Sequence, residues 1–168
     1  MKKIGIAAAI LIVALLMTGV VSALAANEAQ EKTIMIRGIG PDTAMTSDGQ
    51  IVKIIFHELN NETKSGIYNP QSSINSVSGS LSPGYIDAYG PYSWTSGSSV
   101  SESARWTPTN QNIYLGIYDL AQQTGPFLPV SGGSGSVSIT VPWTGSQWTH
   151  AIYNPASNPN PVDYTFTY

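Results

Sequence analysis

Residues 112–168 read NIYLGIYDLAQQTGPFLPVSGGSGSVSITVPWTGSQWTHAIYNPASNPNPVDYTFTY, and this stretch decides the fold class. Apolar side chains occupy every second position in the runs 113–118, 137–141 and 162–168, and the aromatic run 148–153 lies between the last two. Gly, Pro, Asn and Ser separate the runs. Period-two alternation between turn-forming clusters is typical of half-buried antiparallel strands.

The chain before this stretch shows the same pattern more weakly. Residues 33–40 and 51–58 alternate, and we expect them to pair with each other because consecutive antiparallel strands usually do. Val52, Ile54 and Phe56 should then face the core. Three shorter strands are expected at 84–88, 92–95 and 100–106. The whole pattern predicts an all-β protein, a single antiparallel β-sandwich of the jelly-roll type over residues 33–168.

The N-terminus has the features of a secretory signal peptide. Lys2 and Lys3 precede an apolar run from Ile4 to Val21, and Ala23-Leu24-Ala25 has the spacing of a cleavage site. We expect residues 1–25 to be removed and residues 26–32 to form a flexible lead. The alternative is an uncleaved membrane anchor, since the apolar run approaches the length of a spanning helix. Both alternatives place the folded part outside the cytoplasm, secreted or at the extracellular surface.

Composition excludes some classes of partner. Without residues 1–25 the chain has five cations and ten acids, a net charge of −5. Nucleic acid binding requires clustered Lys and Arg, so it is not expected. The chain has no Cys, so stability must come from the apolar core rather than from disulfides.

The closing stretch resembles a known group of secreted domains. Gly135–Pro142, a short Trp-Thr-Gly-Ser-Gln turn, Trp148–Asn154 and Val162–Tyr168 are similar to the last strands of bacterial pre-peptidase C-terminal β-sandwich domains. The resemblance covers residues 112–168. It implies an accessory, non-catalytic domain and carries over no active site.

No catalytic constellation is apparent. The two histidines, His57 and His150, lie far apart in sequence, and we interpret both as surface or rim residues. A Gly-x-Ser-x-Gly elbow is absent. Asp87, Glu102 and Asp119 could supply a glycosidase with its two carboxylates, but we interpret them as solvated acids at strand ends. The sequence therefore predicts that the protein is not an enzyme and carries no cofactor.

A structural calcium ion and a glycan are two further predictions that the sequence leaves open. Asp42, Asp48 and Asp119 fall in expected turns, where carboxylates and carbonyls could bind calcium. Asn61-Glu62-Thr63 is an N-glycosylation sequon.

Aromatic residues supply the candidate binding site. Tyr89, Tyr92 and Trp94 flank a predicted bend at Gly90-Pro91, and Trp143 lies in a later turn. Exposed rings on a β-sheet can stack on sugars, whereas buried rings fill the core. We take these four residues as candidates for ligand binding.

Two functions fit the sequence. The first is a secreted, non-enzymatic module that binds polysaccharide, cell wall or a surface protein. The alternative is a self-associating surface or fibre protein, assembled by edge-strand pairing through the last strand, 162–168, or through a donor strand at 33–36.

Overall fold

The computed structural model describes residues 32–58 and 75–168. The expected signal peptide, the lead up to residue 31 and the sequon at Asn61 lie outside these residues. Within the described ranges, no helix has the length and apolarity needed to cross a membrane.

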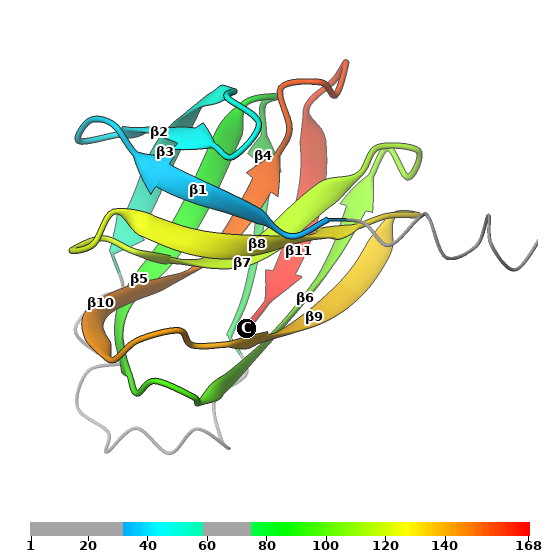
Figure 1. Ribbon diagram of the computed structural model, residues 1–168. Helices are drawn as coiled ribbons and strands as arrows, with labels where there is room; N and C mark the ends of the chain where they lie inside the picture. Colours follow the sequence, from blue (N-terminus) through cyan, green and yellow to red (C-terminus); the bar gives the residue numbers. More distant parts are fainter. Residues whose placement is uncertain (1–31, 59–74) are drawn as a thin grey trace, which may run out of the picture. The chain divides into compact units, whose positions relative to one another are not determined.

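The described residues form eleven β-strands (Figure 1). They are β1 (Ile34–Gly38), β2 (Thr43–Thr46), β3 (Ile51–Glu58), β4 (Ser76–Leu81), β5 (Tyr85–Trp94), β6 (Ser99–Thr107), β7 (Ile113–Asp119), β8 (Thr124–Val130), β9 (Ser134–Thr140), β10 (Gly145–Asn154) and β11 (Val162–Thr167). The all-β prediction is therefore confirmed.

The strands build a closed barrel and a second sheet, so the prediction of a single antiparallel jelly-roll sandwich is wrong. Seven strands close in the order β1-β2-β3-β5-β10-β7-β8, with β8 pairing back to β1. The other four form a sheet in the order β4-β11-β6-β9, which we call sheet B. Figure 1 shows sheet B lying along one wall of the barrel.

Barrel closure depends on two strands that the sequence pattern did not reveal. Residues 33–40 and 51–58 do not pair, because the short strand β2 lies between them and hydrogen-bonds to both β1 and β3. On its other side β3 runs parallel to β5. Strand β8 lies between the alternating runs 113–118 and 137–141, where no strand was expected, and it closes the barrel against β1 through register pairs such as Ile36 with Gly125.

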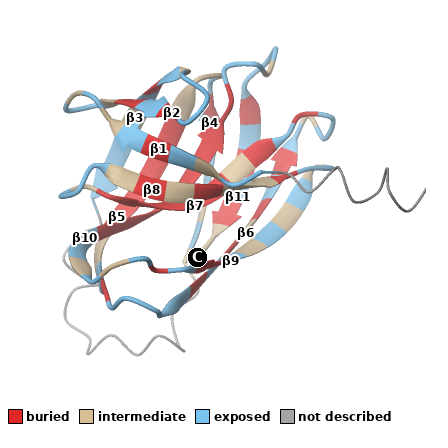
Figure 2. Ribbon diagram, in the orientation of Figure 1, coloured by how far each residue is buried: buried red, intermediate tan, exposed pale blue. Residues whose placement is uncertain are grey.

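Three strands are buried on both faces, since they form the wall that the barrel shares with sheet B. Figure 2 shows buried residues running along β5, β7 and β10. Ile86, Phe127 and Tyr153 belong to the cluster inside the barrel. Ile152 and Leu115 face the other way and pack against sheet B side chains. Strands buried on both sides lose simple alternation, which is why their sequences look less regular.

Gly116 is one position where this packing is tight. A Cβ atom there would lie 2.4 Å from the ring of Phe127 inside the barrel. Only a residue without a side chain allows β7 and the Phe127 ring to approach so closely. The barrel interior is therefore filled by a ring that occupies the space above a glycine.

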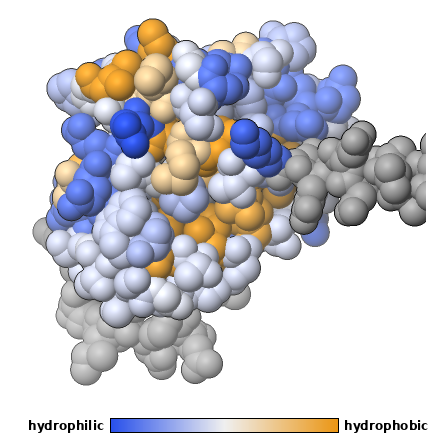
Figure 3. All heavy atoms as spheres, viewed as in Figure 1, coloured by the Kyte–Doolittle hydropathy of each residue, from blue (hydrophilic) through white to orange (hydrophobic). Residues whose placement is uncertain are grey.

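The outer wall of the barrel carries exposed apolar side chains. Met45 on β2 is directly opposite Ile51 on β3, and these residues are 40% and 67% exposed. Figure 3 shows hydrophobic atoms gathered over this corner of the molecule. On β3, Val52 is buried as expected, whereas Phe56, predicted to face the core, is 41% exposed. It lies two residues before β3 ends.

The topology also corrects the expected routes to strand exchange. The last strand, β11, lies between β4 and β6 and is not an edge. The first described strand, β1, is paired on both sides by β2 and β8. The last strand is therefore not an open edge, whereas exchange of a donor strand at 33–36 between copies stays a prediction.

Candidate functional site

Sheet B presents one face that is almost entirely hydroxyl-bearing. Its other face packs on the barrel through residues such as Leu81, Trp106 and Phe166. Because side chains alternate along a strand, the positions between these point outward. All of them are Ser or Thr except Asp163 and Arg105; they are Ser76, Ser78, Ser80, Ser99, Ser101, Ser103, Thr107, Ser134, Ser136, Ser138, Thr140, Thr165 and Thr167. We call this surface the hydroxyl face.

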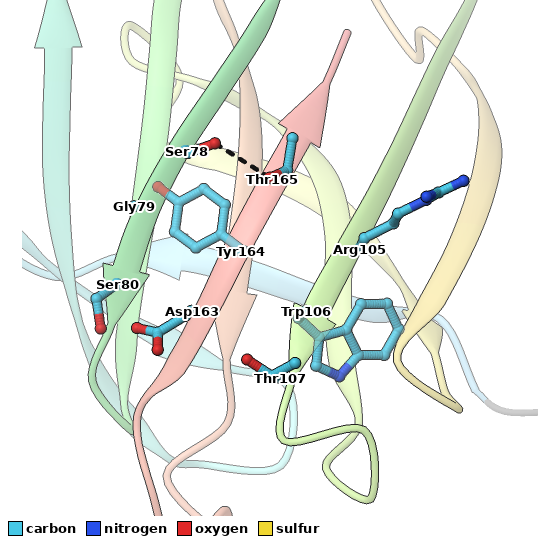
Figure 4. Close-up of a pocket in the computed structure, with 9 residues that line it drawn as sticks. All are labelled: Ser78, Gly79, Ser80, Arg105, Trp106, Thr107, Asp163, Tyr164 and Thr165. Carbon is cyan, nitrogen blue, oxygen red and sulfur yellow. Dashed lines mark hydrogen bonds between the residues drawn. The ribbon is translucent and has the colours of Figure 1, made fainter.

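Strand register aligns these hydroxyl groups in rows across the sheet. Ser78, Thr165, Arg105 and Ser134 form one row, from β4 to β9. Within the face, the Ser78 and Thr165 hydroxyl groups form a hydrogen bond of 3.1 Å, which is the dashed line in Figure 4. Neighbouring strands are about 4.8 Å apart, so the side chains within one row repeat at that spacing.

Three adjoining shallow depressions lie over this face. The first, of about 450 Å³, is lined by Ser78, Ser80, Arg105 and Asp163 among others (Figure 4). The second and third have volumes of about 630 and 590 Å³. They share lining residues: Arg105 borders the first two, and Ser103 the last two. Together they extend across the sheet from β4 to β9.

Beneath the hydroxyl face, a buried carboxyl group contacts a buried imidazole. Glu102 on β6 points toward the barrel, and its Oε1 lies 2.9 Å from Nδ1 of His150 on β10. Burial raises the pKa of Glu102 well above its ordinary value, although backbone groups of Ala151 and Gly116 oppose this shift. Burial also lowers the pKa of His150 to about 3. The pair is therefore favoured as two neutral groups, with a protonated carboxyl donating to imidazole.

A second polar contact between the layers is built around Asp87 on β5. The Tyr164 hydroxyl donates to Asp87 Oδ2 at 2.6 Å. Since that hydrogen is used, the Tyr89 hydroxyl donates to the Tyr164 oxygen, 2.5 Å away. His57 Nε2 lies 2.9 Å from the other oxygen of Asp87. Burial raises the pKa of Tyr89 to about 12, and burial and the bond to Asp87 raise that of Tyr164 further.

These contacts overturn two expectations from the sequence. Asp87, Glu102 and Asp119 were interpreted as solvated acids, but they are 5%, 2% and 2% exposed. His150, interpreted as a surface or rim residue, is buried against Glu102. His57 does lie at the surface, although its ring is held by Asp87 and stacks on Tyr89. Inward-facing polar residues on a strand are hard to identify when their partners lie on distant strands.

The proposed calcium ligands do not come together. In residues 32–58 and 75–168, no three His, Asp or Glu side chains are arranged to hold a metal ion. Asp119 instead accepts hydrogen bonds from the Ala121 backbone at 2.9 Å and from Trp143 Nε1 at 2.7 Å. Asp48 accepts from the Thr46 hydroxyl, and Asp42 from that of Thr43.

The four aromatic candidates occupy positions between the layers or at their rim. Tyr89 and Trp94 are buried, at 8% and 6% exposure, while Tyr92 and Trp143 are half-buried. Tyr92 stacks on Trp94, with ring centroids 5.5 Å apart. Trp143 packs against Trp148 at 4.9 Å. Ligand binding by these rings stays a prediction, and only Tyr92 and Trp143 have surface to offer.

The hydroxyl face was missed in the sequence, although its signal was present. Serine occupies every second position in 76–80, 99–103 and 134–138. The candidate residues predicted from the sequence are aromatic and acidic, and none of them is a serine. A period-two run of Ser is the polar half of the same alternation that predicts a strand.

Comparison with known proteins identifies no family. No protein-family model matches the chain, and no curated protein matches it. Among solved structures, it is similar to PliG of Aeromonas hydrophila, a periplasmic lysozyme inhibitor of g-type lysozyme. The identity is 11%, the match covers 68% of this chain and 95% of PliG, and the TM-score is 0.44. The resemblance of residues 112–168 to pre-peptidase C-terminal domains stays a prediction.

Proposed function

We propose that this protein is a non-catalytic binding module that acts outside the cytoplasm and binds a neutral polysaccharide on its hydroxyl face. The observation that carries the proposal is the near-complete occupation of the outward positions of sheet B by Ser and Thr. The location follows from the predicted signal peptide.

A hydroxyl group suits a sugar because it both donates and accepts hydrogen bonds. An array of them needs no particular charge on the ligand, and a neutral polymer offers hydroxyl groups of the same kind. Each such bond contributes about 0.5–1.5 kcal/mol net, so affinity requires many at once. The adjoining depressions support an extended ligand rather than a single small molecule.

The arrangement of acids supports binding rather than hydrolysis. A glycosidase requires two carboxyl groups on either side of the bond it cleaves. In the described part of sheet B, Asp163 is the one carboxylate on the hydroxyl face. Asp87 and Glu102 lie beneath the sheet and bond to Tyr164 and His150.

The test is a pull-down of the purified protein with insoluble cellulose and chitin. The informative variant is the triple Ser103→Ala, Thr165→Val and Thr167→Val, which removes three central hydroxyl groups without adding charge. At about 1 kcal/mol each, their loss should weaken binding on the order of 100-fold. The matched control is Thr43→Val, Ser47→Ala and Ser82→Ala, outside sheet B, which should bind like the parent.

Two results would overturn the proposal: no binding to either polymer, or equal binding by the parent and the hydroxyl-face triple variant. The half-buried aromatic candidates provide a competing arm. If Trp143→Ala abolishes binding while the triple variant binds normally, the ligand contacts the rim of the aromatic cluster instead. Capture of a surface protein in place of polymer would likewise remove the polysaccharide from consideration.

A further inference from the structure

Among the described residues, sheet B has two open edges, formed by β4 and β9. Each barrel strand in the described residues has a neighbour on both sides, because the barrel is closed. In sheet B, β4 and β9 each pair with a neighbour on one side only. Strand β4 begins two residues after a range that the structure does not describe, whereas the residues on both sides of β9 are all described.

The register fixes which backbone groups of β9 are directed outward from the sheet edge. The Trp106 N–H donates to the Gly133 carbonyl at 2.9 Å, which makes this a hydrogen-bonded pair of the β6–β9 ladder. In an antiparallel ladder such pairs occur at every second residue. Gly135, Val137 and Ile139 therefore bond to β6. The groups directed to the open edge belong to Ser134, Ser136, Ser138 and Thr140, all of them exposed.

Strand β9 has none of the devices that usually prevent strands from joining. Natural edge strands carry Lys, Pro, an inward charge or a bulge. The sequence of β9, Ser-Gly-Ser-Val-Ser-Ile-Thr, contains no charged residue and no Pro. Its pairing with β6 runs from Ser134 to Thr140 without a register shift. The edge is thus straight, uncharged and ready to hydrogen-bond to another strand.

We propose that two copies of this protein form a dimer by pairing β9 with β9, antiparallel, about a twofold axis at Val137. In that register Ser136 faces Ser138 of the second copy, and Ser134 faces Thr140. Every outward N–H and C=O of the four residues then finds a partner. A second copy is the occupant because β9 is its own complement about this axis, with small uncharged side chains facing each other.

The dimer joins the two B sheets into one continuous sheet. Residues whose side chains lie on the hydroxyl face of one copy pair with residues whose side chains lie on the hydroxyl face of the other. The two hydroxyl faces therefore form a single surface. The nearest ionisable side chain on that surface is Arg105, which is one strand away on β6 and opposite Ser134. Like charges therefore do not meet across the axis.

Light scattering coupled to size-exclusion chromatography tests the dimer over a hundredfold range of protein concentration. The parent should approach twice the monomer mass as concentration rises. Ser138→Pro removes an outward N–H that no intramolecular ladder bond uses, so it should give a monomer with an unchanged circular dichroism spectrum. Ser136→Lys should also give a monomer. Ser138→Ala keeps the N–H and should dimerise like the parent.

Several outcomes would overturn the proposal. They are a parent that stays monomeric at every concentration, a Ser138→Pro variant that still dimerises, and assemblies that grow beyond two copies. Ser78→Pro supplies the parallel test for the β4 edge: if it abolishes assembly while Ser138→Pro does not, pairing occurs through β4. None of these readouts depends on polysaccharide, so this proposal and the proposed function fail separately.

Discussion

Tyr164 on β11 donates its hydroxyl hydrogen to Asp87 on β5, across 2.6 Å of the interface between sheet B and the barrel. Removing that hydroxyl leaves a buried carboxylate oxygen without this partner. Tyr164→Phe should therefore lower the free energy of unfolding by about 1–3 kcal/mol in urea denaturation.

A double-mutant cycle separates this bond from general packing. We expect Asp87→Asn with Tyr164→Phe to show a coupling energy above about 0.5 kcal/mol. The cycle pairing Tyr164→Phe with Thr43→Val, on β2, is the control and should be additive. Additivity in both cycles would mean that the Asp87–Tyr164 contact does not hold the layers together.

The pair of Glu102 and His150 predicts how stability depends on pH. The pKa of Glu102 is raised in the folded state, so the folded protein keeps this proton after the unfolded chain has lost it. The contribution of this proton to the free energy of unfolding is complete below about pH 4.5, and it is lost as pH rises toward the pKa of Glu102 in the folded state. Glu102→Gln cannot ionise, so its stability relative to the parent should increase as pH rises from about 4.5 to 9. A pH-independent difference in urea midpoints would contradict the prediction.

His150 gives the free energy of unfolding the opposite dependence on pH, in a more acidic range. Its pKa falls from 6.5 to about 3 on burial, so the unfolded chain takes up a proton that the folded state refuses. Stability should decline as pH falls from about 6.5 toward 3, by a few kcal/mol in total. His150→Gln should flatten this acid limb of a thermal-denaturation series. An equally steep limb in the variant would assign the acid sensitivity to other groups.

Gly116→Ala tests the barrel interior. The added Cβ would lie 2.4 Å from the Phe127 ring, so the ring must move, and we expect a loss of about 1–3 kcal/mol. Phe127→Leu in the same chain should recover part of the loss, because it vacates that space. Gly40→Ala is the control, since its nearest neighbour is 3.7 Å away. A Gly116→Ala melting temperature equal to that of the control would refute the close contact.

Fold class was predictable because alternation is a local property, and the topology was not because closure is a long-range one. The run 137–141 has one face toward the core, and its strand β9 appears where expected. Pro126 and Pro129 concealed β8, although Pro is tolerated in a strand where its position needs no ladder N–H. The four residues of β2 are too few to show a period.

In the candidate site, too, the local features were predictable from the sequence and the contacts between distant strands were not. The serines of 99–103 could have been assigned to one exposed face from the sequence alone, whereas the alignment of Ser103 with Thr167 and Ser136 depends on register between distant strands. Glu102 lies within that run, yet only the approach of β10 gives it His150 as a partner. Aromatic residues such as Trp94 were visible, but whether they were buried was not.

The order of strands in the barrel has a consequence for how the chain folds. Strand β10 is the tenth of the eleven strands in the described residues, yet it lies at the centre of the shared wall, between β5 and β7. A chain made from its N-terminus has β1, β2 and β3 available early, but the strand that joins β5 to β7 follows all the other barrel strands in sequence. Until β10 is present, β5 and β7 each have an unpaired edge, and folding depends on contacts between distant segments. The barrel therefore cannot close until β10 has been synthesised.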